Sequence, residues 1–96
     1  MLVHIVMFAF KEENKEANLA QVKGMLEALP NSIESLKRME VGIDIGKSER
    51  SFDLVLTSTF EDQAGLSAYA IHPAHLEVVS VIKEVTTMAK VVDYIV

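Results

Sequence analysis

The chain has 96 residues, half of them hydrophobic, no cysteine and a net charge of −5. This length predicts one domain over residues 1–96, and such a domain buries only about 60–65% of the surface of its unfolded chain, which leaves little room for a large enclosed cavity. The charge, without any Lys and Arg cluster, excludes nucleic acid as an expected partner, and no apolar run reaches the roughly 18 residues of a membrane-spanning helix.

Residues 1–10 are an apolar run interrupted only by His4 and rich in Val, Ile and Phe, which predicts a β-strand with both faces buried. The run has neither the basic leader nor the small-residue cleavage site of a signal peptide, so we expect a cytoplasmic protein without membrane contact. Asn14 is placed to cap a helix over residues 15–29, which Pro30 ends. The apolar positions of this helix repeat on one face: Leu19, Val22, Leu26 and Leu29.

Two further strands follow on either side of a polar turn at residues 46–51. Residues 36–45 alternate approximately, and Gly42 is expected to mark a bulge. Residues 52–60 alternate more regularly, with Phe52, Leu54 and Leu56 on one face. The pattern predicts an antiparallel pair of strands.

Asp62 is expected to cap a short helix over residues 63–71, and Pro73 is expected to begin another, because proline is well suited to the first helical position. The core face predicted for that second helix consists of Leu76, Val79, Ile82 and Val85. Residues 90–96 alternate as a last strand. The order β-α-β-β-α-β predicts a ferredoxin-like α+β fold, with both helices on one face of an antiparallel four-stranded sheet.

Helices cover only one face of such a sheet, yet the first strand is apolar on both faces. We expect the uncovered face to carry Phe52, Leu54 and Leu56 beside Val6 and Phe8. Two such sheets packed face to face would bury this patch and enclose a small lumen. The sequence therefore predicts a homodimer.

The tract from Tyr69 to His75 holds two of the three histidines and one of the two tyrosines. His72 precedes Pro73, and a residue before proline is driven out of helical geometry. His75 then falls in the first turn of the following helix, where the macrodipole disfavours an imidazolium. A neutral imidazole accepts a proton near neutral pH, which makes this tract the candidate chemical site.

Each of these residues also has a structural interpretation. His75 acts either as a general base or as a hydrogen-bonding residue at the helix start, and His72 either contacts a substrate or caps the helix. His4 either lines the lumen or belongs to the core, and Tyr69 either orients a ligand or packs. His72 and His75 have a possible metal-ligand spacing, but Pro73 breaks the helix between them and no third ligand is evident, so no metal or other cofactor is expected. Asp53 and Asp93 are expected to pair with Lys or Arg.

Four segments in this order resemble the stress-responsive α/β-barrel domain family, the small dimeric α+β barrels, over essentially the whole chain. They are Val3–Phe8, the strand Phe52–Leu56 leading to Phe60-Glu61-Asp62, the tract Tyr69-x-x-His72-Pro73-x-His75, and Val91–Tyr94. The resemblance implies a homodimer whose two sheets form a central barrel. One plant branch of the family is a cofactor-free polyketide cyclase, and its roles would fall on His75 as base, Tyr69 as orienting group and His4 as a cavity residue. That branch has a histidine where this chain has Leu54.

Two functions remain open. The first is a homodimer whose central cavity, lined by His4, Val6, Phe8, Leu54, Leu56 and His72, binds a small apolar or aromatic molecule. The second is a cofactor-free, polyketide-cyclase-like enzyme with His75 and Tyr69 as its catalytic residues. Monooxygenases with the same barrel fit these motifs less well. Convergence of His4, Tyr69 and His75 on one pocket would favour the enzyme.

Overall fold

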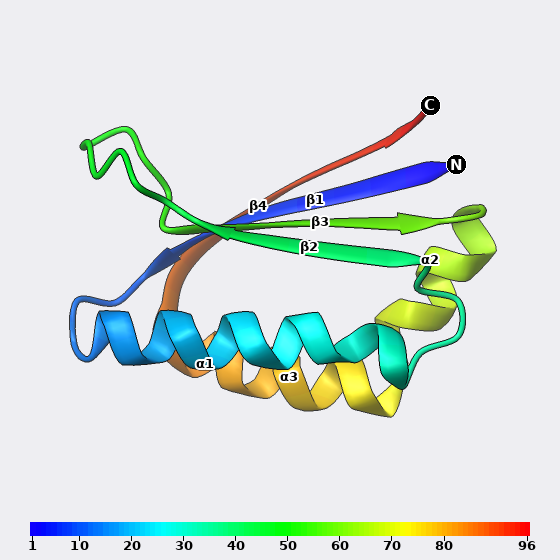
Figure 1. Ribbon diagram of the computed structural model, residues 1–96, viewed down its shortest axis with the longest axis horizontal. Coiled ribbons are helices and arrows are strands. Elements are labelled where there is room, and N and C mark those ends of the chain that lie inside the picture. Colours follow the sequence, from blue (N-terminus) through cyan, green and yellow to red (C-terminus); the bar gives the residue numbers. More distant parts are fainter.

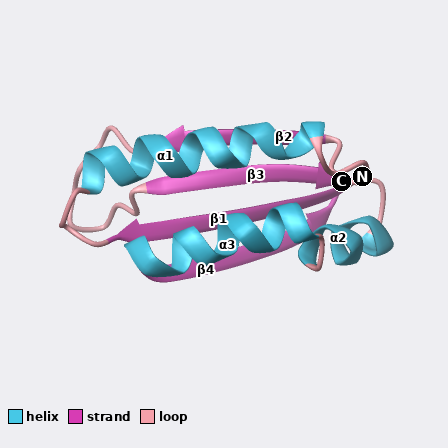
Figure 2. Cartoon of the chain, turned by 90° about the horizontal axis from the view of Figure 1, so that it is seen from below, coloured by secondary structure: helices cyan, strands magenta, loops and turns pink.

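A four-stranded antiparallel sheet carries its helices on one face in the computed structural model, which describes residues 1–96 (Figure 1). The strands are ordered β2-β3-β1-β4 across the sheet. Seen from the helical side, α1 lies along β2 and β3, while α3 lies over β1 and β4 (Figure 2). In chain order the elements are β1 (Leu2–Phe10), α1 (Lys15–Ala28), a 3₁₀ turn (Leu29–Asn31), β2 (Arg38–Ile43), β3 (Leu54–Phe60), α2 (Gln63–Ala70), α3 (Pro73–Val85) and β4 (Thr86–Ile95). The predicted ferredoxin-like α+β fold is confirmed.

The start of β4 differs most from the prediction, because this strand begins at Thr86 rather than at residue 90. α3 ends directly in the strand: Thr86 has an extended backbone, and its Oγ1 donates to the Ile82 carbonyl oxygen at 2.8 Å. The hydroxyl thus caps the last turn of α3, and two successive β-branched residues, Thr86 and Thr87, favour the extended chain that follows.

The bulge predicted at Gly42 is wrong. Gly42 pairs with Val55 in an unbroken β2–β3 register, and the irregularity lies instead between Ala9 and Phe10, where β1 pairs with β4. A Cβ at Gly42 would make only an ordinary contact of 3.5 Å with Val55. The glycine therefore gives a local signal that pairing with a regular neighbouring strand overrides.

The core-facing side of α1 is as predicted, and that of α3 is so only in part, since Ile82 is buried and Val85 packs against the core. Leu19, Val22 and Leu26 of α1 are buried. In α3 the buried residues are Val78 and Ile82, whereas Leu76 is 51% exposed. Because α3 is apolar at 76, 78, 79, 81 and 82, two overlapping stripes satisfy helical spacing, and packing against α1 and the sheet selects one of them.

The faces of the sheet are the reverse of the prediction. Val6, Phe8, Leu54 and Leu56 belong to the buried core beneath the helices. Their register explains this placement, since Val6 pairs with Leu56 and Phe8 with Leu54, and directly opposed residues share a face. The uncovered face carries the alternate positions of the strands: Val3, Ile5, Met7 and Ala9 of β1, Val55 of β3, and Met88, Val92 and Tyr94 of β4.

Candidate functional site

The tract from Tyr69 to His75 is a helix, a break and a second helix, as predicted. Asp62 caps α2 by accepting from the Gly65 N–H at 2.9 Å. His72 has an extended backbone, with φ −66° and ψ 135°, and is the N-cap of α3, while Pro73 is its first residue. The break redirects the chain, and His75 in the first turn of α3 contacts the carbonyl oxygen of Ala70 at the end of α2.

The break places the ring of His75 against that of Tyr69. Their ring centroids are 4.2 Å apart. A second ring, that of His4 on β1, has its centroid 6.4 Å from that of Tyr69. Phe60 at the end of β3 supports the tyrosine ring at 5.1 Å. We call His4, Tyr69 and His75 the aromatic cluster; three elements distant in sequence supply it.

The aromatic cluster lies between the sheet and the helices of one subunit, not on the uncovered face. His4 shares the helix-covered side of β1 with Leu2 and Val6, because side chains alternate along a strand. The expectation that His4 faces a lumen between two sheets is therefore wrong. Its ring does lie near those of Tyr69 and His75, but the three residues do not line a common pocket.

His75 is held in one tautomer. Its Nδ1 lies 3.1 Å from the Ala70 carbonyl oxygen. A carbonyl oxygen only accepts, so Nδ1 carries the proton and Nε2 of the neutral ring keeps a free lone pair. Burial lowers the pKa of His75 from 6.5; the hydrogen bond to Ala70 opposes this shift, and the nearby His4 and His72 add to it. The ring is a neutral proton acceptor at pH 7.

Tyr69 is the complementary group. Its side chain is 2% exposed, and burial raises its pKa to about 12. The hydroxyl therefore stays protonated at neutral pH and can donate a hydrogen bond. A proton acceptor and a neutral donor side by side can remove a proton from a bound molecule and stabilise the oxyanion that forms.

Asp93 is a site residue that sequence reasoning missed. It was expected to pair with Lys or Arg, and that expectation is wrong: Asp93 Oδ1 lies 2.5 Å from His4 Nδ1. The two residues are directly opposed in the β1–β4 register, which would have given the only sequence signal. The carboxylate accepts from Nδ1 of His4. Asp53 does pair with a lysine, Lys15, at 3.4 Å.

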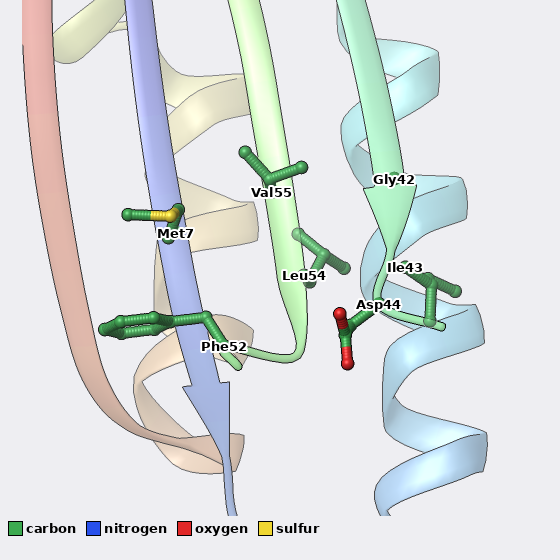
Figure 3. Close-up of a pocket in the computed structure, with 7 residues that line it drawn as sticks. All are labelled: Met7, Gly42, Ile43, Asp44, Phe52, Leu54 and Val55. Carbon is green, nitrogen blue, oxygen red and sulfur yellow. The ribbon is translucent and has the colours of Figure 1, made fainter. Parts of the chain in front are cut away.

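Three surface hollows occur on the molecule, and His4, Tyr69 and His75 line none of them. Of the other predicted cavity residues, Leu54 lines a hollow of ≈ 270 Å³ and His72 one of ≈ 490 Å³, whereas Val6, Phe8 and Leu56 line none. The smaller hollow lies at the rim of the uncovered face, where Phe52 reaches toward Met7 of β1 (Figure 3). None of the helices has both the length and the apolar character required to cross a bilayer.

Comparisons with known proteins agree with this architecture. The model of the stress responsive A/B barrel domain matches residues 2–96. Two Arabidopsis thaliana stress-response A/B barrel domain-containing proteins are similar: At5g22580, 34% identical over 77% of this chain and 67% of its own, and HS1, 25% identical over 95% and 85%. A dimeric protein of unknown function with a ferredoxin-like fold from Bacteroides fragilis superposes with a TM-score of 0.89 at 28% identity, covering 97% of this chain and 93% of its own. With the fold, the Tyr69–His75 tract and these matches in agreement, the chain belongs to the stress-responsive A/B barrel domain family.

Proposed function

We propose that this protein is a homodimer in which each subunit binds a small aromatic or carbonyl compound at the aromatic cluster, whose side chains line no hollow and must therefore move apart to admit it, and that His75 takes a proton from it without a cofactor. The single observation that carries the proposal is the tautomer of His75. The hydrogen bond to Ala70 leaves Nε2 as a free acceptor beside the ring of Tyr69. A general base needs this combination of correct protonation state and adjacent electrophilic support.

The roles follow from the protonation states. His75 Nε2 accepts a proton from an acidic C–H or O–H, and the Tyr69 hydroxyl donates to the oxygen on which negative charge develops. His4, whose Nδ1 is held by Asp93 at 2.5 Å, has its ring 6.4 Å from that of Tyr69. A flat ring system suits the site, because four rings already meet there in tilted or edge-to-face contacts.

The homodimer is supported by the uncovered face of the sheet. This face is apolar along β1, and on β4 it exposes Met88, Val92 and Tyr94 by 43–56%. Exposed apolar patches of this kind mark interaction surfaces. The Bacteroides fragilis relative is dimeric, and packing two such faces together would bury the patch.

Proton exchange measures the proposed step directly. We expect the protein to accelerate exchange of the α-protons of acetophenone in D₂O, followed by NMR, with a rate that falls on acidification as His75 becomes protonated. His75→Gln should lower that rate by about 100-fold or more, and Tyr69→Phe should lower it less. Leu76→Ala, an exposed change on the same helix, is the matched control. Equal rates for wild type and His75→Gln would refute the role of His75 as base.

A second candidate function rests on the hollow of ≈ 270 Å³ at the rim of the uncovered face, where Met7, Phe52 and Val55 supply an apolar lining. In a dimer built on this face, the hollow would open toward the partner and could hold an apolar ligand. We expect the neutral dye N-phenyl-1-naphthylamine to bind there with enhanced fluorescence, and Met7→Gln to weaken the binding. Dye binding that is unaffected by Met7→Gln but lost in Tyr69→Ala would assign the dye to the aromatic cluster instead.

A further inference from the structure

The largest hollow of the molecule, ≈ 490 Å³, is separate from the aromatic cluster. It lies between the chain segment that precedes β2, where Ser32, Ser35 and Lys37 line it, and the α2–α3 break, where Ala68 and His72 line it. Five of its seven lining residues are polar or charged, whereas five of the seven that line the hollow on the sheet are hydrophobic. The Tyr69–His75 tract thus contributes side chains to two sites: His75 lies against Tyr69 in the aromatic cluster, and His72 lines this hollow.

Ser35 has an unusual hydroxyl. Its Oγ is the one buried side-chain polar atom in the chain that has no hydrogen-bond partner. Burying a hydroxyl without a partner is unfavourable. The Oγ is closed to solvent, but Ser35 lines the hollow, so a rotation of the side chain would bring the hydroxyl to a ligand there. Unsatisfied buried groups of this kind call for a physical explanation.

His72 offers a second donor to the hollow. Its Nδ1 accepts a hydrogen bond from the Ala74 N–H at 3.0 Å as the cap of α3. A ring nitrogen that accepts carries no proton, so in the neutral ring the proton is on Nε2. The cap therefore makes His72 a hydrogen-bond donor on its other side, next to the positive end of the α3 dipole.

The charges around the hollow are mixed. Lys37 is the cation of the lining and Glu34 the acid, and Glu61 approaches the Lys37 ammonium at 4.0 Å. This ion pair is long and its side chains are 41% and 73% exposed, so it contributes little and can yield to a ligand. Lys37 Nζ also donates to the Glu34 carbonyl oxygen at 3.3 Å, which keeps the amine beside the hollow.

We propose that this hollow is a binding site for the oxyanion of a small molecule, a carboxylate or a phosphate monoester. The Ser35 hydroxyl and the His72 Nε2–H donate to the oxyanion, and Lys37 supplies the opposite charge. The site is independent of the proton transfer proposed for His75. It gives His72 a role that the aromatic cluster does not use.

Titration of the full-length protein with inorganic phosphate and with acetate, at constant ionic strength set by chloride, tests the proposal by amide NMR. We expect saturable shifts at Ser35 and Ala74. Stronger binding of phosphate assigns a phosphate monoester, and stronger binding of acetate assigns a carboxylate. The lack of saturable shifts with both anions would overturn the proposal.

Two sets of variants separate binding from folding. Ser35→Ala should lower the affinity for the anion by about fivefold, the effect of one hydrogen bond. The melting temperature of the unliganded protein should not fall, because the hydroxyl removed has no partner. His72→Asn keeps both a capping oxygen and a donor and should retain binding, whereas His72→Asp keeps the cap but repels the anion and should lose it. His75→Gln should bind like wild type. Unchanged binding in Ser35→Ala and His72→Asp, or a loss in His75→Gln, would contradict the assignment.

Discussion

The hydrogen bond at Nδ1 decides what each of the three histidines can do. In His4 and His75 this nitrogen faces an oxygen, of Asp93 and of the Ala70 carbonyl, and must donate. In His72 it accepts from the Ala74 N–H. The neutral ring of His75 therefore keeps a basic Nε2, whereas a neutral ring of His72 presents an Nε2–H donor. Identical side chains thus acquire different chemistry from single backbone or side-chain partners.

His75→Gln should make unfolding less sensitive to acid. The pKa of His75 is lowered in the folded protein, so the unfolded chain binds more protons. The free energy of unfolding therefore decreases as the pH falls from about 6.5 through the pKa of the folded state. Above that window the variant and wild type should differ little. Urea denaturation at pH 8 and pH 5 measures the difference. A larger loss in the variant than in wild type on acidification, or an NMR pKa of His75 above 6.5, would contradict this.

Asp93→Ala should destabilise the protein by about 1 kcal/mol at pH 7, because it leaves His4 Nδ1 without its acceptor while the exposure of the aspartate limits the strength of the pair. Glu84→Ala, which removes an exposed carboxylate from α3, is the control and should change the free energy of unfolding by far less. Equal effects of the two substitutions would show that Asp93 acts only through net charge.

At the scale of elements, the break between α2 and α3 builds the site. Pro73 suits the first position of α3 and excludes helical geometry at His72. A continuous helix through residues 69–76 would move His75 around the helix axis relative to Tyr69. The break therefore determines the 4.2 Å contact between the two rings.

The cap at His72 can be tested alone. His72→Ala removes the acceptor of the Ala74 N–H and should lower the free energy of unfolding by about 1 kcal/mol, whereas His72→Asn, a good N-cap, should restore most of it. Chemical denaturation at pH 8, where a histidine is neutral, gives both values. Equal destabilisation by Ala and Asn would mean that the ring packs rather than caps.

At the scale of the whole molecule, the two faces of β1 have different tasks. One face completes the core with α1 and α3, and the other is left uncovered beside an edge strand, β4, whose residues from Thr87 to Ile95 are all exposed. An exposed apolar edge strand favours association with another chain. A dimer would cover both features of the sheet.

Substitutions on the two faces should therefore have different outcomes. Ile5→Asp, on the uncovered face, should give a folded monomer by sedimentation and circular dichroism. The carboxylate would be buried without a partner only in the dimer interface, so it disfavours association but not folding. Val6→Asp, one residue along and buried in the core, should unfold the chain. A folded Ile5→Asp dimer, or a wild-type protein that is monomeric at micromolar concentration, would exclude the proposed interface.

Local signals in the sequence were sufficient for the order of the elements, the cap at Asp62, the break at Pro73 and the position of His75 in the first turn of α3. Each of these depends on neighbours within about four residues, through capping, proline sterics or periodicity. They also led to the aromatic cluster as the candidate site. Asn14 shows where local reasoning stops: it is the N-cap of α1, but with a left-handed backbone and no side-chain cap bond.

The tertiary structure alone decided which face of the sheet the helices cover, which stripe of α3 is buried and that Asp93 holds His4. β1 is apolar on both faces, so its alternation is compatible with either choice, and the choice moved Val6, Phe8, Leu54 and Leu56 from the expected lumen into the core. The His4–Asp93 pair joins residues 89 positions apart and depends on the register of two adjacent strands, β1 and β4. Register and facing are set by the packing of the whole core, because no short segment contains the partners that define them.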